Sequence, residues 1–244
     1  MASAIAGVIF APMNWAHRKW VWPQRMEGLV RMIQPRLRAG ERVLDVGCGN
    51  GQFGKLLMEH QSSPQGLEFH GVEPEGLIRP ETAIPVQAFD GVHLPYEDNA
   101  FDVVLLTDVL HHAAEPGPLV AECVRVAKRR VVIKDHVVYG KWDRMRLSFS
   151  DWLANVIHGV PCTFGYFSRD GWHEIAKTSG ATVVDPAWGP RQYDWGILEK
   201  LFGGRLQCVV ELEAGGAAAL TPEIKTTGAS PEALTIWSGR SDLL

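Results

Sequence analysis

The sequence has little cysteine, no surplus of positive charge and no long apolar run. Its four cysteines, Cys48, Cys123, Cys162 and Cys208, lie far apart and form no C-x-x-C pair. We therefore expect neither a zinc site nor a disulfide framework, and we expect the protein to be cytoplasmic. Lys and Arg number 24 against 28 Asp and Glu, which makes nucleic acid a poor partner. The apolar opening, residues 2–13, is shorter than the roughly 18–20 residues of a membrane span and follows no basic residue, so we expect neither export nor stable membrane insertion.

Short β-branched apolar runs alternate with helical stretches between Arg42 and Leu212, as in a parallel sheet that is covered on both faces. The predicted strands are Arg42–Val46, Leu67–Val72, Ala83–Val86, Phe101–Leu106, Arg130–His136, Thr182–Asp185 and Leu206–Leu212. The predicted helices are Gln24–Leu37, Gln52–Glu59, Pro118–Ala127, Lys141–Ile157 and Arg169–Thr178, the last with Ser168 as N-cap. The length of 244 residues allows one or two domains, and all seven strands are needed for one sheet.

We therefore predict an α/β, Rossmann-like fold: a doubly wound, seven-stranded, mostly parallel sheet whose last strand is antiparallel. This domain spans residues 41–212. Residues 1–40 are predicted to form an N-terminal helical arm, and about 138–167 a helical lid between the fifth and sixth strands. Residues 213–244 have little periodicity and are predicted to form a loosely packed tail.

A glycine-rich loop, Gly47-Cys48-Gly49-Asn50-Gly51, joins the first strand to a helix. Because glycine has no side chain, a ligand can contact the backbone of this loop directly. The loop lies at the carboxyl edge of the sheet, where the carboxyl ends of the parallel strands meet and where ligands of such sheets bind. The dinucleotide fingerprint needs a glycine at position 52, which is Gln52, and this weakens the dehydrogenase interpretation. Glu73, at the end of the second strand, can accept hydrogen bonds from a ribose, so the pair favours an adenosine-containing ligand. The alternative is a tight turn with Glu73 capping a helix.

The segment Val43–Gly51 resembles the first motif of class I S-adenosylmethionine-dependent methyltransferases. The resemblance continues through Leu94-Pro95-Tyr96, Phe101–Val104 and Val109–His112, in the style of the ubiquinone/menaquinone-biosynthesis-like branch. It covers roughly residues 35–134. One departure is Lys128-Arg129-Arg130, where the family often has a Lys-Pro-Gly-Gly turn.

The resemblance implies methyl transfer from S-adenosylmethionine to an oxygen, nitrogen or carbon nucleophile of a small molecule, in a biosynthetic pathway, with S-adenosylhomocysteine as product. It also implies the cofactor contacts. These are Asp45 as support of the loop, Gly47, Cys48, Gly49 and Gly51 beside the methionine part, Glu73 and Pro74 at the ribose, Asp90 and Gly91 at the adenine, and Thr107, Asp108 and Val109 on the methyl-donor side.

Three histidines are candidate bases: His136, which ends the fifth strand, and His111 and His112, which follow the fourth. The alternatives are a packed His136 bonded to Asp135 or backbone, and a pocket-shaping role for the other two. Adjacent strand residues point to opposite faces, so Asp135 and His136 are poorly placed to share a magnesium ion, and we predict no metal.

Tryptophan is abundant, with nine residues, several of them outside the predicted sheet. The two segments that hold Trp15, Trp20, Trp142 and Trp152 are predicted substrate walls, because small-ligand pockets are mostly apolar. Arg146 would bind a substrate carboxylate or phosphate. The alternatives are aromatic residues that pack on the core and an arginine that is solvated.

We expect a monomer or homodimer that acts on a small molecule. Three other functions stay open: a non-catalytic cofactor-binding protein, an NAD-dependent oxidoreductase, and an RNA or protein methyltransferase.

Overall fold

The computed structural model describes residue 15, residues 17–155 and residues 163–214. Its seven strands form one sheet in the order β3-β2-β1-β4-β5-β7-β6, with β7 antiparallel to both neighbours. The strands are β1 Arg42–Val46, β2 Glu68–Pro74, β3 Val86–Phe89, β4 Phe101–Thr107, β5 Ala127–His136, β6 Ala181–Trp188 and β7 Gln207–Ala214. The predicted fold class is confirmed.

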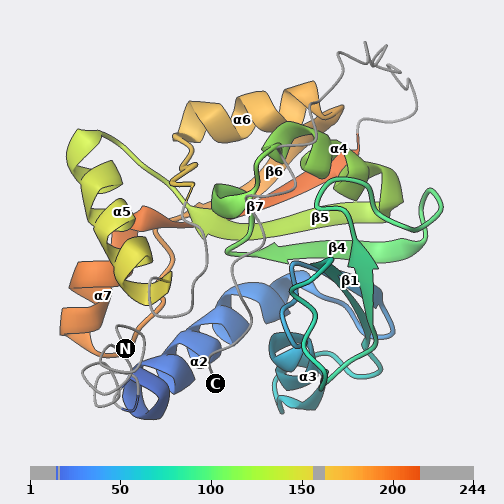
Figure 1. The fold of residues 1–244 in the computed structure, drawn as a ribbon, viewed down its shortest axis with the longest axis horizontal. Helices are drawn as coiled ribbons and strands as arrows, with labels where there is room; N and C mark the ends of the chain where they lie inside the picture. Colours follow the sequence, from blue (N-terminus) through green and yellow to red (C-terminus); the bar gives the residue numbers. More distant parts are fainter. Residues whose placement is uncertain (1–14, 16, 156–162, 215–244) are drawn as a thin grey trace, which may run out of the picture.

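Helices cover both faces of the sheet (Figure 1). The α-helices are α2 Trp22–Ile33, α3 Gln52–Glu59, α4 Pro116–Val126, α5 Lys141–Asn155, α6 Arg169–Thr178 and α7 Gly196–Phe202. A short π-helix, His17–Val21, precedes α2. On one face, α2 and α3 pack on Val43, Leu105 and Val209, and on the other α4 and α6 pack on Leu44, Leu106 and Val210. Both faces are therefore closed, which leaves the carboxyl edge as the place for a ligand.

Several predicted boundaries were wrong. The third strand was predicted at Ala83–Val86 but begins at Val86, because Pro85 has no N–H to donate and the buried Ile84 packs beneath Gly51 instead. Residues 213 and 214 belong to β7 and not to a tail. The short helix α7 was not predicted. Residues 1–14 and 16 of the predicted arm, residues 156–162 of the predicted lid and residues 215–244 of the predicted tail lie outside the described residues.

The arm packs closely on the loop that follows β6. A Cβ on Gly28 of α2 would collide with the backbone oxygen of Gln192. We expect Gly28→Ala to lower the free energy of unfolding by about 1–3 kcal/mol, the usual cost of overpacking. Denaturant unfolding would measure it, with Gly117→Ala as control, because a Cβ at Gly117 meets nothing within 4 Å. Equal stability of the two variants would contradict this packing.

Among the described residues, no helix is both long and apolar enough to cross a bilayer.

Candidate functional site

The glycine loop leaves β1 in a left-handed conformation. Gly47, Gly49 and Gly51 have φ angles of 69°, 58° and 74°, which favour glycine. A Cβ on Gly47 would come within 2.7 Å of the Val109 side chain, so this position is closed by packing. A Cβ on Gly49 would meet nothing within 4 Å, so the backbone there is open to a ligand.

Two buried carboxyl groups lie beneath this loop. Glu73, which is 9% exposed, accepts a hydrogen bond of 2.7 Å from the backbone N–H of Gly49 through Oε2. Burial raises the pKa of Glu73. Burial, with the nearby charge of Glu73, raises the pKa of Asp45 to about 8. Asp45 is therefore mostly protonated at neutral pH, and Glu73 is the carboxyl group that accepts from the loop backbone.

The remaining predicted cofactor residues lie along the same edge. Cys48 fills the space over Gly71, and burial raises the pKa of its thiol. Pro74 is buried at the end of β2. Asp90 follows β3, and its Oδ1 accepts from the backbone N–H groups of Val92 (2.8 Å) and His93 (2.6 Å). Gly91 has a φ of 92° and open space beside it.

Asp108 joins three elements at the end of β4. It has a φ of 57°, and its Oδ1 lies 2.5 Å from Lys134 Nζ of β5. Its Oδ2 lies 2.5 Å from Arg25 Nη2 of α2. Burial alone would raise the pKa of Asp108, but the charges of Lys134 and Arg25 hold it well below its usual range. Two cations thus share one anion, which leaves a net positive charge beside the open loop.

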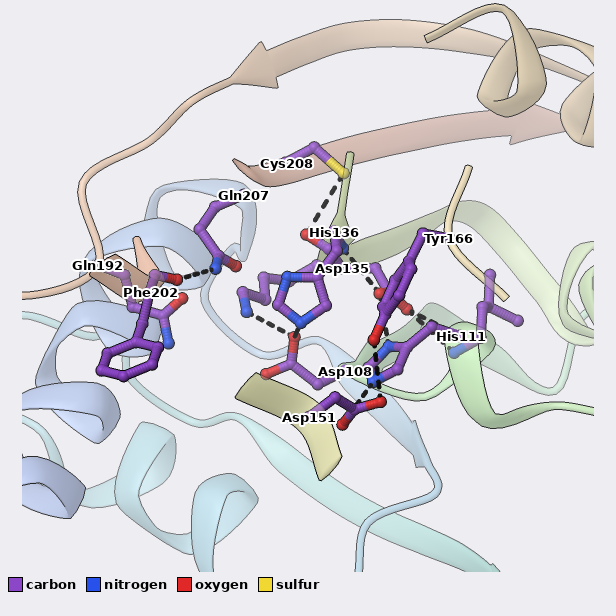
Figure 2. A network of polar contacts seen from close by, with 12 residues as sticks. Asp108, His111, Asp135, His136, Asp151, Tyr166, Gln192, Phe202, Gln207 and Cys208 are labelled. Carbon is purple, nitrogen blue, oxygen red and sulfur yellow. Dashed lines mark hydrogen bonds and ion pairs between the residues drawn. The ribbon is translucent and has the colours of Figure 1, made fainter. Parts of the chain in front are cut away.

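A second polar cluster lies beside Asp108 and His136 at the end of β5 (Figure 2). Asp135 Oδ1 lies 2.7 Å from His111 Nδ1, and its Oδ2 accepts from the Leu110 backbone N–H at 3.0 Å. Asp151 of α5 lies 3.8 Å from His111 Nε2 and accepts a 3.1 Å hydrogen bond from the Tyr166 hydroxyl. Burial alone would lower the pKa of His111, but Asp135 and Asp151 raise it to about 10. His111 is thus a buried cation between two carboxylates.

The buried ion pair of His111 with Asp135 predicts that the stability of the fold depends on pH. Removing one partner of a buried ion pair costs about 3–5 kcal/mol, so His111→Gln should lower the free energy of unfolding by about that amount near neutral pH. The folded pKa of about 10 lies above the ordinary 6.5. The contribution is therefore full below about pH 6.5 and is lost as pH rises toward 10.

Urea unfolding at several pH values would measure this loss. His173→Gln, which changes an exposed histidine of α6, is the control. A deficit in His111→Gln that grows above pH 7 would contradict the ion pair.

His136 has the opposite environment. Burial and the charge of His111 lower its pKa to about 4, so its imidazole is neutral at pH 7. Its Nε2 lies 4.0 Å from Asp108 Oδ1, and its Nδ1 has no hydrogen-bond partner among the described residues. Of the three predicted bases, His136 is in the protonation state that accepts a proton and His111 is not. His112 lies beside His111, with its Nε2 3.7 Å from Asp151 Oδ1.

Asp135 and His136 lie closer to each other than their alternation along β5 suggests. The Asp135 carboxylate bends back to accept from the His136 backbone N–H at 2.7 Å. One potential ligand atom each of His111, Asp135 and His136 therefore lies within 4.8 Å of the others, and the same holds for His111, His112 and Asp151. The absence of a metal stays a prediction.

The predicted substrate tryptophans lie at one end of the sheet. Trp15 and Trp20 form an edge-to-face pair with centroids 5.1 Å apart, next to α2. Trp142 and Trp152 of α5 are 76% and 49% exposed, so the alternative that they pack on the core was wrong. Arg146 donates to the carbonyls of Lys200 (2.8 Å) and Leu201 (3.0 Å) and joins α5 to α7. Its guanidinium is therefore already engaged by protein.

Four residues of the site were not predicted from the sequence: Arg25, Lys134, Asp151 and Tyr166. A lysine within an apolar strand was a usable signal for Lys134. The other three come from helices or loops that meet the edge only after folding, so no local pattern marks them.

Comparison with known proteins indicates a family and a fold. The model of the family described as methionine biosynthesis protein MetW matches residues 28–154. An uncharacterized methyltransferase of Mycobacterium avium is 32% identical over 182 residues, which cover 64% of this chain and 70% of that protein. A ubiquinone biosynthesis O-methyltransferase of Photorhabdus laumondii is 31% identical over 124 residues, which cover 48% of each chain. The chain thus spans about two thirds of the first protein and about half of the second.

A solved structure shares the fold. The 1,6-didemethyltoxoflavin-N1-methyltransferase of Burkholderia thailandensis, bound to 1,6-didemethyltoxoflavin and S-adenosylhomocysteine, superposes with a TM-score of 0.54. It is 18% identical, over 86% of this chain and 89% of that one.

Proposed function

The chain belongs to the MetW family and is a methyltransferase, and we propose that it transfers the methyl group of S-adenosylmethionine to a small-molecule acceptor. The observation that carries this proposal is the open backbone at Gly49, held by the buried Glu73 carboxylate at the carboxyl edge of the sheet. Ligands of open α/β sheets bind at this edge.

The residues at the edge fit this cofactor. Glu73 uses one carboxylate oxygen for the loop, and its other oxygen can accept from a ribose hydroxyl. Asp90 and Gly91 lie after β3, where the family pattern has its adenine contacts. The net positive charge of Arg25, Lys134 and Asp108 suits the carboxylate of the methionine moiety.

Methyl transfer from S-adenosylmethionine requires few catalytic groups. S-adenosylmethionine supplies a methyl group that is already activated on a sulfonium, and alignment of the nucleophile can contribute about 7–11 kcal/mol. His136 is neutral at pH 7 and stands at the end of β5, where it can accept the proton of an attacking O–H or N–H group. Its low pKa means that the proton then passes readily to solvent.

A small acceptor is favoured over a macromolecule. The formal charge of −4 means that the chain has no surplus of positive charge to attract an RNA backbone. The printed names of the P. laumondii relative and of the B. thailandensis enzyme refer to ubiquinone biosynthesis and to 1,6-didemethyltoxoflavin, which are small-molecule chemistry. We carry over the class of acceptor and not its identity.

Transfer of radiolabel tests the acceptor class. The full chain would be incubated with S-[methyl-³H]adenosylmethionine and, separately, a low-molecular-mass cell extract, total RNA and total protein. We expect label in the small-molecule reaction only. Label in acid-precipitated RNA or protein would overturn a small acceptor. Binding of the cofactor without label in any reaction would instead support a non-catalytic cofactor-binding protein.

A further inference from the structure

We propose that Gln207 is a positioning residue that holds the proton of His136 on Nδ1 and so leaves Nε2 as the basic nitrogen. This inference rests on the proposed role of His136 as the base. It starts from two buried polar atoms, His136 Nδ1 and Gln207 Oε1, neither of which has a hydrogen-bond partner among the described residues. Burying such an atom without a partner is energetically unfavourable, so the two atoms are candidates to satisfy each other.

The two residues face each other across the sheet. In the antiparallel pairing of β5 with β7, His136 is in direct register with Gln207. Side chains of directly opposed residues lie on one face of the sheet, with Cβ atoms about 4.5–5.5 Å apart. In Figure 2 the Gln207 side chain lies between Phe202 and the ring of His136. A direct hydrogen bond, or one bridging water, therefore connects the two orphan atoms with little movement.

The orientation of the Gln207 amide is determined by its other bond. Gln207 Nε2 donates to the carbonyl oxygen of Phe202 at 2.7 Å. A flip of the amide would set two carbonyl oxygens against each other, so Oε1 is the atom on the open side. A carbonyl oxygen only accepts. The group that meets it must donate, and a neutral imidazole can do so from Nδ1–H.

The surroundings leave Nε2 as the deprotonated atom. Asp108 would favour a proton on Nε2, but the 4.0 Å separation is too long for a hydrogen bond, and both Asp108 oxygens are engaged by Lys134 and Arg25. The backbone of His136 is also held: its N–H donates to Asp135, and its carbonyl accepts from Trp172 Nε1 at 3.2 Å. The ring therefore stays opposite Gln207, with Nε2 toward Asp108 and the methyl-donor side of the site.

Lys134 is the competing donor. It lies two residues before His136 on the same face of β5, and it could in principle satisfy Gln207 Oε1. Its Nζ is held by Asp108 at 2.5 Å, however, and Gln207 Oε1 remains without a partner. If Lys134 donated a hydrogen bond to Gln207 Oε1, no acceptor would hold the proton of His136 on Nδ1. Replacing Gln207 distinguishes these two cases.

Nitrogen NMR of the full chain tests this inference without an acceptor. In protein labelled with ¹⁵N-histidine at neutral pH, long-range ¹H–¹⁵N correlations distinguish Nδ1–H from Nε2–H, and His136→Gln identifies the His136 signals. We expect the Nδ1–H tautomer in the wild-type chain. We expect Gln207→Met to shift His136 toward Nε2–H, and Gln207→Glu, which keeps an acceptor oxygen, to retain Nδ1–H. Gln192→Met, at another buried glutamine, is the control and should leave the tautomer unchanged.

An Nε2–H tautomer in the wild-type chain, or an unchanged tautomer in folded Gln207→Met, would overturn the inference. If Gln207→Met fails to fold, an Nε2–H tautomer in the wild-type chain or in Gln207→Glu still overturns the inference. Because no methyl transfer is measured, failure here leaves the proposed function intact, and a chain that transfers no methyl group can still show the tautomer. Once an acceptor is in hand, turnover of Gln207→Met should fall toward the loss in His136→Ala, with the affinity for S-adenosylmethionine unchanged.

Discussion

Replacing His136 with alanine should lower turnover by about 10²–10⁴-fold, the usual contribution of a positioned base, while the affinity for S-adenosylmethionine changes little. The reason is placement: His136 ends β5, neutral at pH 7 and 4.0 Å from Asp108. It is 4.9 Å, ring to ring, from the protonated His111. Steady-state kinetics with the acceptor found by radiolabel transfer would give turnover, and calorimetry would give cofactor affinity.

Two controls separate catalysis from folding in this variant. His173→Ala, at an exposed position on α6, should leave both quantities unchanged. His136→Ala should also keep a cooperative thermal transition, because Trp172 is bonded to the backbone carbonyl of His136 and not to its ring. Equal losses of turnover and of cofactor affinity would show a structural role and remove His136 from the mechanism.

Replacing Glu73 with alanine should lower the affinity for S-adenosylmethionine and leave turnover at saturating cofactor nearly unchanged. Glu73 is 9% exposed, and it holds the Gly49 N–H and is proposed to hold the ribose, so the variant loses charge-assisted hydrogen bonds at both places. One such bond contributes about 1.5–3 kcal/mol, which predicts a 10- to 100-fold loss of affinity for S-adenosylmethionine. At saturating cofactor, turnover should recover to near the wild-type value.

Glu75→Ala is a matched control, since it removes an exposed carboxylate two residues further along the chain. Calorimetric titrations of both variants with S-adenosylmethionine would compare them. Wild-type affinity in Glu73→Ala would show that this carboxylate only supports the turn, which is the role that the alternative interpretation gives it.

The parts of the fold that follow from local pattern were predictable. The runs that became β1, β2, β4 and β5 are apolar because both faces of the sheet are covered, and buried parallel strands show this composition. The loop from Gly47 to Gly51 was predictable because the left-handed backbone there requires glycine. The predicted Ser168 cap is confirmed, since its Oγ accepts from the Gly171 N–H at 3.1 Å.

The partners within the site were not predictable, because they depend on register and on docking. A packed His136 bonded to Asp135 was only an alternative interpretation, and in the structure Asp135 accepts from the His136 backbone N–H and not from its ring. Asp135 Oδ1 also lies 2.7 Å from His111 Nδ1, a partner from the segment after β4 that no local pattern indicates. Arg25 reaches Asp108 only because the arm packs across the sheet, 83 residues away in sequence. Gln207 meets His136 through the pairing of β7 with β5, which no periodicity encodes.

The substrate end was only partly predictable. Aromatic residues at helical spacing indicated an amphipathic α5, but periodicity does not say what the apolar side faces. In the structure Trp142, Met145 and Phe149 are 76%, 54% and 61% exposed, and among the described side chains of that helix only Leu147 is a buried apolar core residue. The role of these side chains as substrate walls remains a prediction.

The central claim is that the glycine loop and Glu73 bind S-adenosylmethionine. Isothermal titration calorimetry of the full chain with this compound tests it most directly, with S-adenosylhomocysteine as competitor and NADH as the ligand of the rival oxidoreductase. We predict saturable binding at one site, displacement by S-adenosylhomocysteine, and no heat with NADH. No heat and no thermal shift at millimolar S-adenosylmethionine would contradict the account.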